Sequence, residues 1–231
     1  MTAMYPEFLA VGFDQQPGEI SDVIFDQELV GEEDCGDGYQ LCAAYVDPSG
    51  VRISVGLRDS KPYLHAGVSG PVSGAGEVTR LSDTTARVDL GDAMVLANVE
   101  LPANYPSDEP QSAREIRLSA VGVEGIRVYP SEEAYVAEED SAAVGQLISL
   151  GLISLQSSAQ QPNAIAFLSG RCREAELRTN TLTGKNFWYL LVDTKVPLAV
   201  ALPEGVKPVP AVGSVVVGQV LVYASEMSSP A

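Results

Sequence analysis

Three consecutive aromatic residues, Phe187, Trp188 and Tyr189, are the residues of this sequence best suited to bind a ligand. They follow a predicted turn, and four cationic residues lie nearby: Arg171, Arg173, Arg178 and Lys185. Aromatic rings beside cationic side chains can stack on the bases of single-stranded nucleic acid or on other planar ligands. If 187–194 is a strand, its side chains alternate, so Phe187 and Tyr189 share one face and Trp188 lies on the other. One set must fill the protein interior, and the other must be exposed or covered. We expect packing for most of them and ligand binding as the alternative.

Catalytic chemistry has little support in the sequence. The only histidine is His65, so no second imidazole exists for a two-histidine metal site, and no G-x-S-x-G nucleophile motif occurs. The acidic segment 32-EEDCGDG-38 could attract a divalent cation, but it lacks the regular spacing and distal Glu of a calcium-binding loop. We therefore predict no catalytic residues, no metal site and no cofactor.

The three cysteines, Cys35, Cys42 and Cys172, are an odd number at no metal-ligand spacing. Cys35 and Cys42 flank a Gly-Asp-Gly turn and could face each other across a hairpin, although unpaired thiols are our expectation. This cysteine usage favours a reduced, cytoplasmic protein.

The charge is strongly negative, with 31 acidic and 14 basic residues and a net charge of −17. Residues 1–159 hold eight Lys or Arg and 26 Asp or Glu, whereas residues 160–231 hold six and five. A polyanion would be repelled at long range, because nonspecific nucleic-acid binding depends on neutralising phosphates. Only the C-terminal part is compatible with such a ligand, so nucleic acid is not the favoured partner.

The sequence shows neither the pattern of a secretory signal at its first residues nor an apolar run long enough to span a membrane. The first residues have no basic region before an apolar stretch, as a secretory signal would. The longest apolar run, 142–155, is too short and too interrupted by Gly and Ser to span a bilayer. We expect no membrane association.

Most of the chain reads as short β-strands separated by Gly, Pro, Asp or Asn. Residues 40–57 predict a hairpin through the turn Asp47-Pro48-Ser49-Gly50. Many short strands at this spacing are typical of barrels and sandwiches. The other predicted strands are 93–101, 115–129, 187–194, 198–203 and 213–224.

The interval 130–156 is the exception and predicts helix. Ser131 is a suitable N-cap, with acidic residues in the following turn. The pattern allows one long helix or two short ones broken near Asp140-Ser141, and the helical part should be mostly buried. Apolar residues at helical spacing are Val144, Leu147, Ile148, Leu152 and Leu155.

An internal repeat is suggested by the segments 68–102 and 168–203. Both open with an apolar residue followed by Ser-Gly, and both close with V-x-L-P. Chance similarity of two β-rich segments is the alternative. We predict an N-terminal acidic β domain, 1–130, containing the first copy at about 65–130, a helical connector at 131–160, and the second copy at 161–231. Residues 1–64 are expected to add strands to the first copy.

The second copy resembles an OB-fold, the small Greek-key barrel of oligonucleotide- and oligosaccharide-binding modules. The resemblance is at fold level and is carried by Ser169-Gly170, the hairpin arm 183-TGKNFWYLLVDT-194 and 212-VGSVVVGQV-220. It departs from the standard fold because 204-EGVKPVPAVG-213 predicts no helix. A fifth strand must also come from elsewhere, or from splitting the last strand at Gly218. The fold class predicted is therefore mainly β, with two tandem OB-like barrels joined by a helical segment.

Two functions follow from these observations. The favoured one is a non-catalytic, acidic interaction protein that binds an unidentified protein partner or self-associates, because acidic proteins often bind basic surfaces. The alternative is single-stranded nucleic-acid or oligosaccharide binding by the C-terminal module, as the OB-fold resemblance implies.

Overall fold

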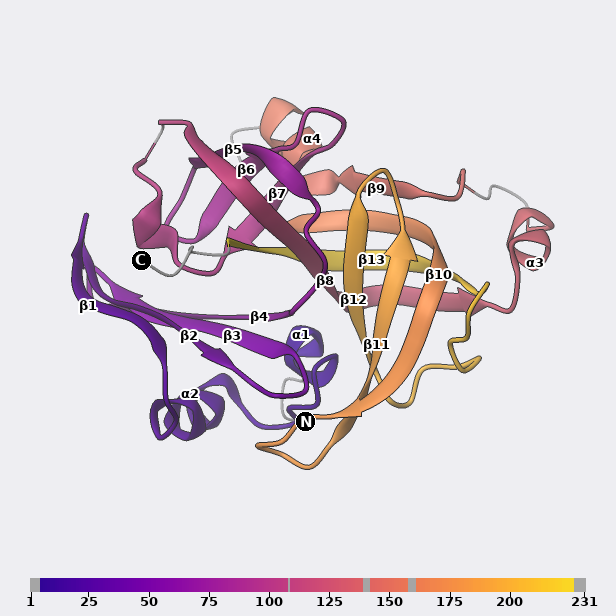
Figure 1. Ribbon diagram of the computed structural model, residues 1–231, viewed down its shortest axis with the longest axis horizontal. Helices are drawn as coiled ribbons and strands as arrows, with labels where there is room; N and C mark the ends of the chain where they lie inside the picture. The colour runs from indigo at the N-terminus through magenta and orange to yellow at the C-terminus, as the bar shows by residue number, and fades with distance from the viewer. Residues whose placement is uncertain (1–4, 108, 139–141, 158–160, 227–231) are drawn as a thin grey trace.

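The computed structural model describes residues 5–107, 109–138, 142–157 and 161–226. It is mainly β, as predicted, and its strands form two sheets. Figure 1 shows the smaller sheet and the N-terminal helices on one side of the molecule and the larger sheet on the other. No helix in these described segments is long and apolar enough to cross a bilayer.

The N-terminal region forms its own antiparallel sheet, in which the strands follow one another in chain order. The predicted hairpin turn at 47–50 is confirmed between the second and third strands. The expectation that residues 1–64 add strands to the first copy is wrong, because this sheet has no pairing with the larger one. The elements are α1 (Pro6–Leu9), α2 (Pro17–Phe25), β1 (Val30–Gly36), β2 (Tyr39–Val46), β3 (Val51–Arg58) and β4 (Lys61–Val68).

Helix α2 was missed by the strand-dominated sequence interpretation. Its start carries Pro17 in the first turn, and Gln16 and Glu19 form a reciprocal capping box with each other's backbone. Ile20 and Ile24, one helical turn apart, are its buried residues. Pro17 and Glu19 are sequence signals of a helix start, whereas Gln16 is not one of the usual N-cap residues.

The larger sheet contains nine strands in the order β11-β12-β8-β5-β6-β7-β13-β10-β9. Additional pairings join β11 to β10 and β8 to β13. The strands are β5 (Gly74–Arg80), β6 (Thr85–Asp89), β7 (Met94–Val99), β8 (Gln111–Tyr129), β9 (Gln146–Ser149), β10 (Ile165–Thr179), β11 (Asn186–Asp193), β12 (Pro197–Pro203) and β13 (Val215–Glu226).

These pairings close into two circuits that share β8 and β13. The first circuit runs through β8, β5, β6, β7 and β13, and the second through β13, β10, β11, β12 and β8. In each circuit one parallel pairing makes the closure: β7 with β13, where Asn98 is opposite Tyr223, and β12 with β8, where Ala199 is opposite Ser119. The first circuit consists of β5–β8 from the first predicted copy and β13 from the second. The second circuit consists of β10–β13 from the second predicted copy and β8 from the first. Strands of 161–231 therefore pair directly with strands of 65–130.

Strand β13 continues through Gly218 instead of splitting there. The register with β8 shifts at Val217–Gln219, which marks a bulge. Gly218 has a φ of 145°, and a side chain at this position would place its Cβ 2.8 Å from Ile126 Cα. The glycine lets two strands approach closely, so a single long strand can serve both circuits.

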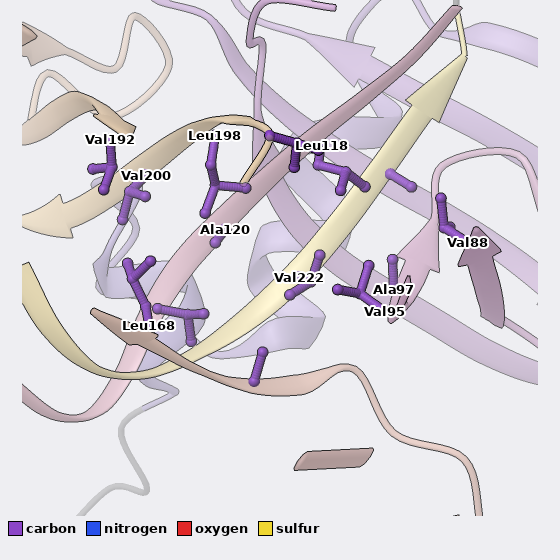
Figure 2. Close-up of a cluster of buried hydrophobic side chains, with 14 of the residues drawn as sticks. Val88, Val95, Ala97, Leu118, Ala120, Leu168, Val192, Leu198, Val200 and Val222 are labelled. Carbon is purple, nitrogen blue, oxygen red and sulfur yellow. The ribbon is translucent and has the colours of Figure 1, made fainter. Parts of the chain in front are cut away.

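A continuous apolar core fills both circuits (Figure 2). Inward-facing side chains of the shared strands contribute to it together with those of both halves, so the two circuits are packed as one unit. Its members include Val88, Val95 and Ala97 from the first circuit, Leu168, Val192, Leu198 and Val200 from the second, and Leu118, Ala120 and Val222 from the shared strands.

The predicted connector is only partly helical. Ser131 caps α3 (Glu132–Val136) by accepting a 3.3 Å hydrogen bond from Ala134 N, as predicted. Residues 146–149, however, form β9 on β10, so the assignment of Leu147 and Ile148 to a helix is wrong. The open edge of β10 offers hydrogen bonds that outweigh apolar spacing. The possible break at 140–141 lies outside the described residues.

Helix α4 (Leu150–Ser157) follows β9 directly. Gly151 is its buried residue and Ile153 is 53% exposed, so the expectation of a mostly buried helix is wrong. Between β12 and β13 the chain forms turns without a helix, as predicted.

Candidate functional site

The aromatic face formed by Phe187 and Tyr189 is covered. Phe187 is fully buried and Tyr189 is 6% exposed. Both belong to a second apolar cluster together with N-terminal residues such as Phe8, Phe13 and Ile53. The N-terminal helices and the smaller sheet thus occupy the surface on which a base or sugar would have to stack.

Trp188 lies on the opposite side of β11 and packs partly buried against the core of the two circuits. Its Nε1 donates a 3.3 Å hydrogen bond to the Glu204 carbonyl. The alternation expected from the sequence is therefore present: Trp188, Leu190 and Val192 share the core side of β11.

Arg178 is bound within the protein. Its guanidinium carbon lies 3.4 Å from the ring centroid of Tyr189, and its Nη2 lies 2.7 Å from a carboxylate oxygen of Glu176. Nη1 also donates to the Ser49 carbonyl at 3.2 Å. Arg178, Ser49 and Thr181 help to line a shallow pocket of about 490 Å³.

The other predicted cations do not form one basic surface with Arg178. Arg173 pairs with Asp193 at 3.3 Å, and Lys185 pairs with Asp14 at 3.1 Å. Arg171 is exposed on β10, where its register partner is also Asp193. Acidic neighbours thus offset the charge that would attract phosphates.

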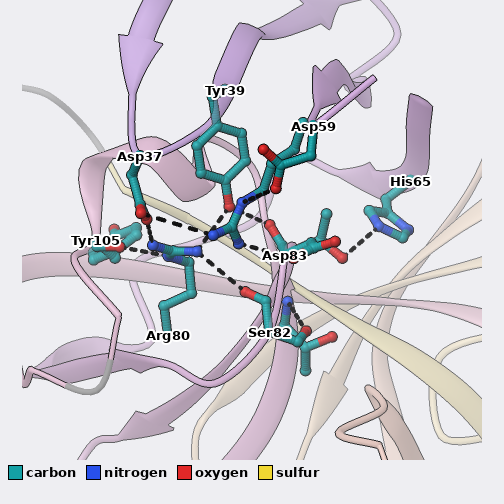
Figure 3. Close-up of polar contacts among 11 residues, drawn as sticks. Asp37, Tyr39, Asp59, His65, Arg80, Ser82, Asp83 and Tyr105 are labelled. Atoms are coloured by element: carbon teal, nitrogen blue, oxygen red, sulfur yellow. Dashed lines mark hydrogen bonds and ion pairs between the residues drawn. The ribbon is translucent and has the colours of Figure 1, made fainter. Parts of the chain in front are cut away.

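A polar network joins the two sheets and was not predicted (Figure 3). At its centre Arg80 of β5 is fully buried. Its Nε donates to the Tyr105 carbonyl at 2.6 Å, its Nη1 donates to the Tyr39 hydroxyl at 3.1 Å, and its Nη2 forms an ion pair with Asp37. A buried guanidinium requires such a set of acceptors, because an unpaired buried charge is very costly. We call this set the Arg80 network.

Two guanidinium groups, those of Arg58 and Arg80, lie beside the Tyr39 ring. The Arg58 and Arg80 guanidinium carbons lie 4.9 and 5.3 Å from its ring centroid. Its hydroxyl donates to the Asp83 carbonyl, while Arg58 Nη1 donates to the Asp83 carboxylate at 2.8 Å. Burial raises the pKa of Tyr39 to about 12, so the phenol stays protonated at neutral pH. It acts as a hydrogen-bonding group there.

His65 lies at the same interface between the sheets. Its Nε2 is 2.9 Å from Thr84 Oγ1 and its Nδ1 is 3.3 Å from Asn98 Nδ2. Burial lowers the pKa of His65 to about 4, so the imidazole is neutral at pH 7. Both ring nitrogens are occupied by a hydroxyl and an amide, an arrangement that holds the ring in place and offers no free nitrogen for proton transfer.

A second buried cluster ties β3 to β13 through Glu100. Arg52 Nε and Nη2 donate to the two Glu100 oxygens at 2.5 and 2.8 Å, and the Tyr223 hydroxyl donates to one of them at 3.0 Å. Ser54 Oγ also donates to the Glu100 carbonyl at 2.6 Å. Burial raises the pKa of Tyr223 well above its usual value. This bidentate, charge-assisted geometry indicates a structural clamp.

A pocket of about 360 Å³ lies between β1 and the short 3₁₀ turn η1 (Pro102–Asn104). Cys35 and Cys42 are among its lining residues, with Leu101 and Asn104. Across the described segments, no three His, Cys, Asp or Glu side chains come together as metal ligands. The acidic segment 32–38 instead contributes Asp37 to the Arg80 network.

Known proteins provide no further assignment. No protein-family model, curated protein or solved structure matches this chain. The function must therefore be inferred from its charge, its surface and its buried polar groups.

Proposed function

We propose that the protein is a non-catalytic binding protein whose partner presents a basic protein surface. The observation that carries this proposal is the charge of the N-terminal region, where residues 1–51 contain no Lys or Arg. Complementary charge accelerates encounter and selects partners. The acidic residues of this region are Glu7, Asp14, Glu19, Asp22, Asp26, Glu28, Glu32, Glu33, Asp34, Asp37 and Asp47.

Exposed apolar side chains within this acidic region support the proposal. Phe25 is 50% exposed and Val23 is 39% exposed on α2, and Val30 is 60% exposed at the start of β1. Asp22 and Asp26 flank the first two along the helix, and both are exposed. An aromatic and apolar centre with a polar rim is typical of a protein-binding surface.

The test is affinity capture with the variant Phe25→Ser and the control Val212→Ser. Val212 is 73% exposed and lies in the C-terminal part, where the charge is balanced. Immobilised wild type is expected to retain a basic protein from native lysate, to release it as salt rises, and to cross-link to it through carboxylates of residues 1–51. Phe25→Ser should reduce retention at least about tenfold, because a central aromatic contact is worth 2 kcal/mol or more (about thirtyfold in affinity). Equal retention by both variants, or cross-links outside residues 1–51, would contradict the proposal.

We also propose that each strand circuit is an OB-like barrel and that the chain contains an internal duplication. The support is the equivalent order of pairings in the two circuits, including one parallel closure in each. The strand that had no source in the sequence comes from the other copy in both cases. Such an exchange ties two copies into one folding unit, as in domain swapping.

Single-stranded nucleic-acid binding is the weaker proposal, because the face of Phe187 and Tyr189 is covered. Trp188 is the only Trp and packs partly buried on the core side of β11, so its fluorescence reports on any ligand that binds near this strand. We expect blue-shifted emission that oligo(dT) does not quench at low salt. Quenching that weakens as salt rises would instead favour nucleic-acid binding over the acidic-surface proposal.

A further inference from the structure

Cys35 and Cys42 lie together at the free edge of the smaller sheet. Cys35 is in β1 and Cys42 in the neighbouring strand β2. Figure 1 shows β1 at the edge of the smaller sheet. Both line the same pocket, and the Cys35 side chain interacts with the Cys42 thiol. None of the three cysteines forms a disulfide in the structure. Two thiols that interact beside a pocket can undergo chemistry that one thiol cannot perform.

The strand that carries Cys35 has an irregular backbone at that position. β1 pairs on one side with β2, and the register between them shifts from Glu33 to Gly36, across Cys35. Asp34, within this irregularity, has a φ of 51°, which a non-glycine residue adopts at a bulge. A disulfide needs Cα atoms within about 7 Å, so any closing movement would fall on this irregular edge strand, which pairs only with β2.

The two thiols differ in their access to solvent. Cys35 is half-buried, whereas Cys42 is 2% exposed. Burial raises the pKa of the Cys42 thiol, so it remains protonated at neutral pH. Cys35 is therefore the sulfur that meets an oxidant in solution, and Cys42 is placed to react with the oxidised product.

We propose that Cys35 and Cys42 form a reversible dithiol–disulfide pair, a modification site that is independent of the proposed function. With hydrogen peroxide as the oxidant, the Cys35 thiolate attacks one oxygen and the O–O bond breaks. This gives a sulfenic acid at Cys35, while the displaced hydroxide takes up a proton to become water. Cys42 sulfur then attacks the Cys35 sulfur, the S–OH bond breaks, and the hydroxide leaves with the Cys42 proton as a second water. A dithiol reductant reverses the oxidation.

The disulfide would close the β1–β2 hairpin whose tip carries Asp37. Asp37 pairs with Arg80 across the sheets, so the linkage would also fix one arm of the Arg80 network. Oxidation is therefore expected to slow amide hydrogen exchange in 30–46 and to leave β10–β13 unchanged.

Peptide mapping after mild oxidation tests the proposal. The intact protein is treated with a small excess of hydrogen peroxide, the remaining thiols are alkylated, and the peptides are separated without reduction. We expect a linked Cys35–Cys42 pair, lighter by two hydrogen atoms and reversed by dithiothreitol. Cys172 is 1% exposed and should stay a thiol until alkylated after unfolding, so it reports on folding within the same sample.

Two variants separate the roles of the sulfurs. In Cys42→Ser the sulfenic acid at Cys35 should persist and be labelled by dimedone, whereas Cys35→Ser should give neither label nor linkage. The matched control Cys172→Ser should form the Cys35–Cys42 link at the wild-type rate. The proposal is overturned if the wild type accumulates sulfenic or sulfinic acid at Cys35 without linkage. It is also overturned if Cys35 stays reduced while Cys172 is protected.

Discussion

Glu100→Gln is the substitution whose effect on stability follows most directly from the structure. Glu100 is 5% exposed and accepts two hydrogen bonds from Arg52 and one from Tyr223. The amide keeps the side-chain shape but removes the charge and places an NH2 donor against the Arg52 donors. Arg52 is then left as a mostly buried cation without its anion.

Breaking a buried ion pair by removing one partner costs about 3–5 kcal/mol. The Arg52 side chain is 21% exposed, so water screens part of this loss and the lower end applies. We expect Glu100→Gln to reduce the free energy of unfolding by about 3 kcal/mol. The matched control is Asp83→Asn, whose side chain is 59% exposed and pairs with Arg58, and which should cost less than about 1 kcal/mol.

Urea unfolding followed by circular dichroism measures both variants, with an unchanged m-value as the condition for comparison. The double variant Arg52→Met/Glu100→Gln removes both charges and should recover about 1 kcal/mol or more relative to the sum of the single variants. Equal losses for Glu100→Gln and Asp83→Asn would refute the assignment of Glu100 as a buried clamp. Strict additivity in the double variant would refute the pairing itself.

Three further predictions concern protonation, folding units and loop anchoring. The pKa of His65 is about 4 in the folded protein, below its usual 6.5, so the unfolded chain binds more protons between these pH values. The contribution of His65 to the free energy of unfolding is therefore complete above pH 6.5, and about 3 kcal/mol of it is lost as the pH falls to 4. The single imidazole signal in an NMR titration gives this pKa directly, and a value near 6.5 would contradict the burial argument. The fragment 161–231 should be unfolded by circular dichroism, because β12 and β13 both lose β8; a cooperative, monomeric fold would disprove the shared-strand dependence. Asp47→Ala should cost about 3 kcal/mol in urea unfolding, because Tyr45, Ser49 and Thr181 all donate to the buried carboxylate; a loss below 1 kcal/mol would contradict it.

At the candidate site, local sequence patterns predict the direction of side chains along a strand but not which face is covered. The alternation of side chains in β11 follows from strand geometry alone, and the structure has it. Which face would be covered depended on residues 5–68, whose helices and separate sheet pack on Phe187 and Tyr189. The charge of Arg178 and Lys185 likewise gave no indication that Glu176 and Asp14 would be their partners.

The Arg80 network was outside the reach of sequence reasoning. Arg80 is followed by Leu81 and then by a polar run, 82-SDTT-85, so its sequence context is that of an ordinary charged residue near a turn. Its acceptors come from Tyr39 on the other sheet and from Tyr105 in a loop, so no fixed spacing connects them. Contacts between sheets join residues far apart in the chain, so no local sequence pattern predicts them.

The sequence alone determined the strand-rich class, the turn at 47–50, the N-cap at Ser131 and the uneven charge, because each depends on neighbouring residues or composition. The tertiary structure decided that β8 and β13 serve two circuits, since pairing partners far apart in the chain are chosen by the whole sheet. It also placed Leu147 and Ile148 in strand β9, although their spacing predicts a helix. The reason is that β9 forms hydrogen bonds with the open edge of β10, and local propensity does not include such a distant partner.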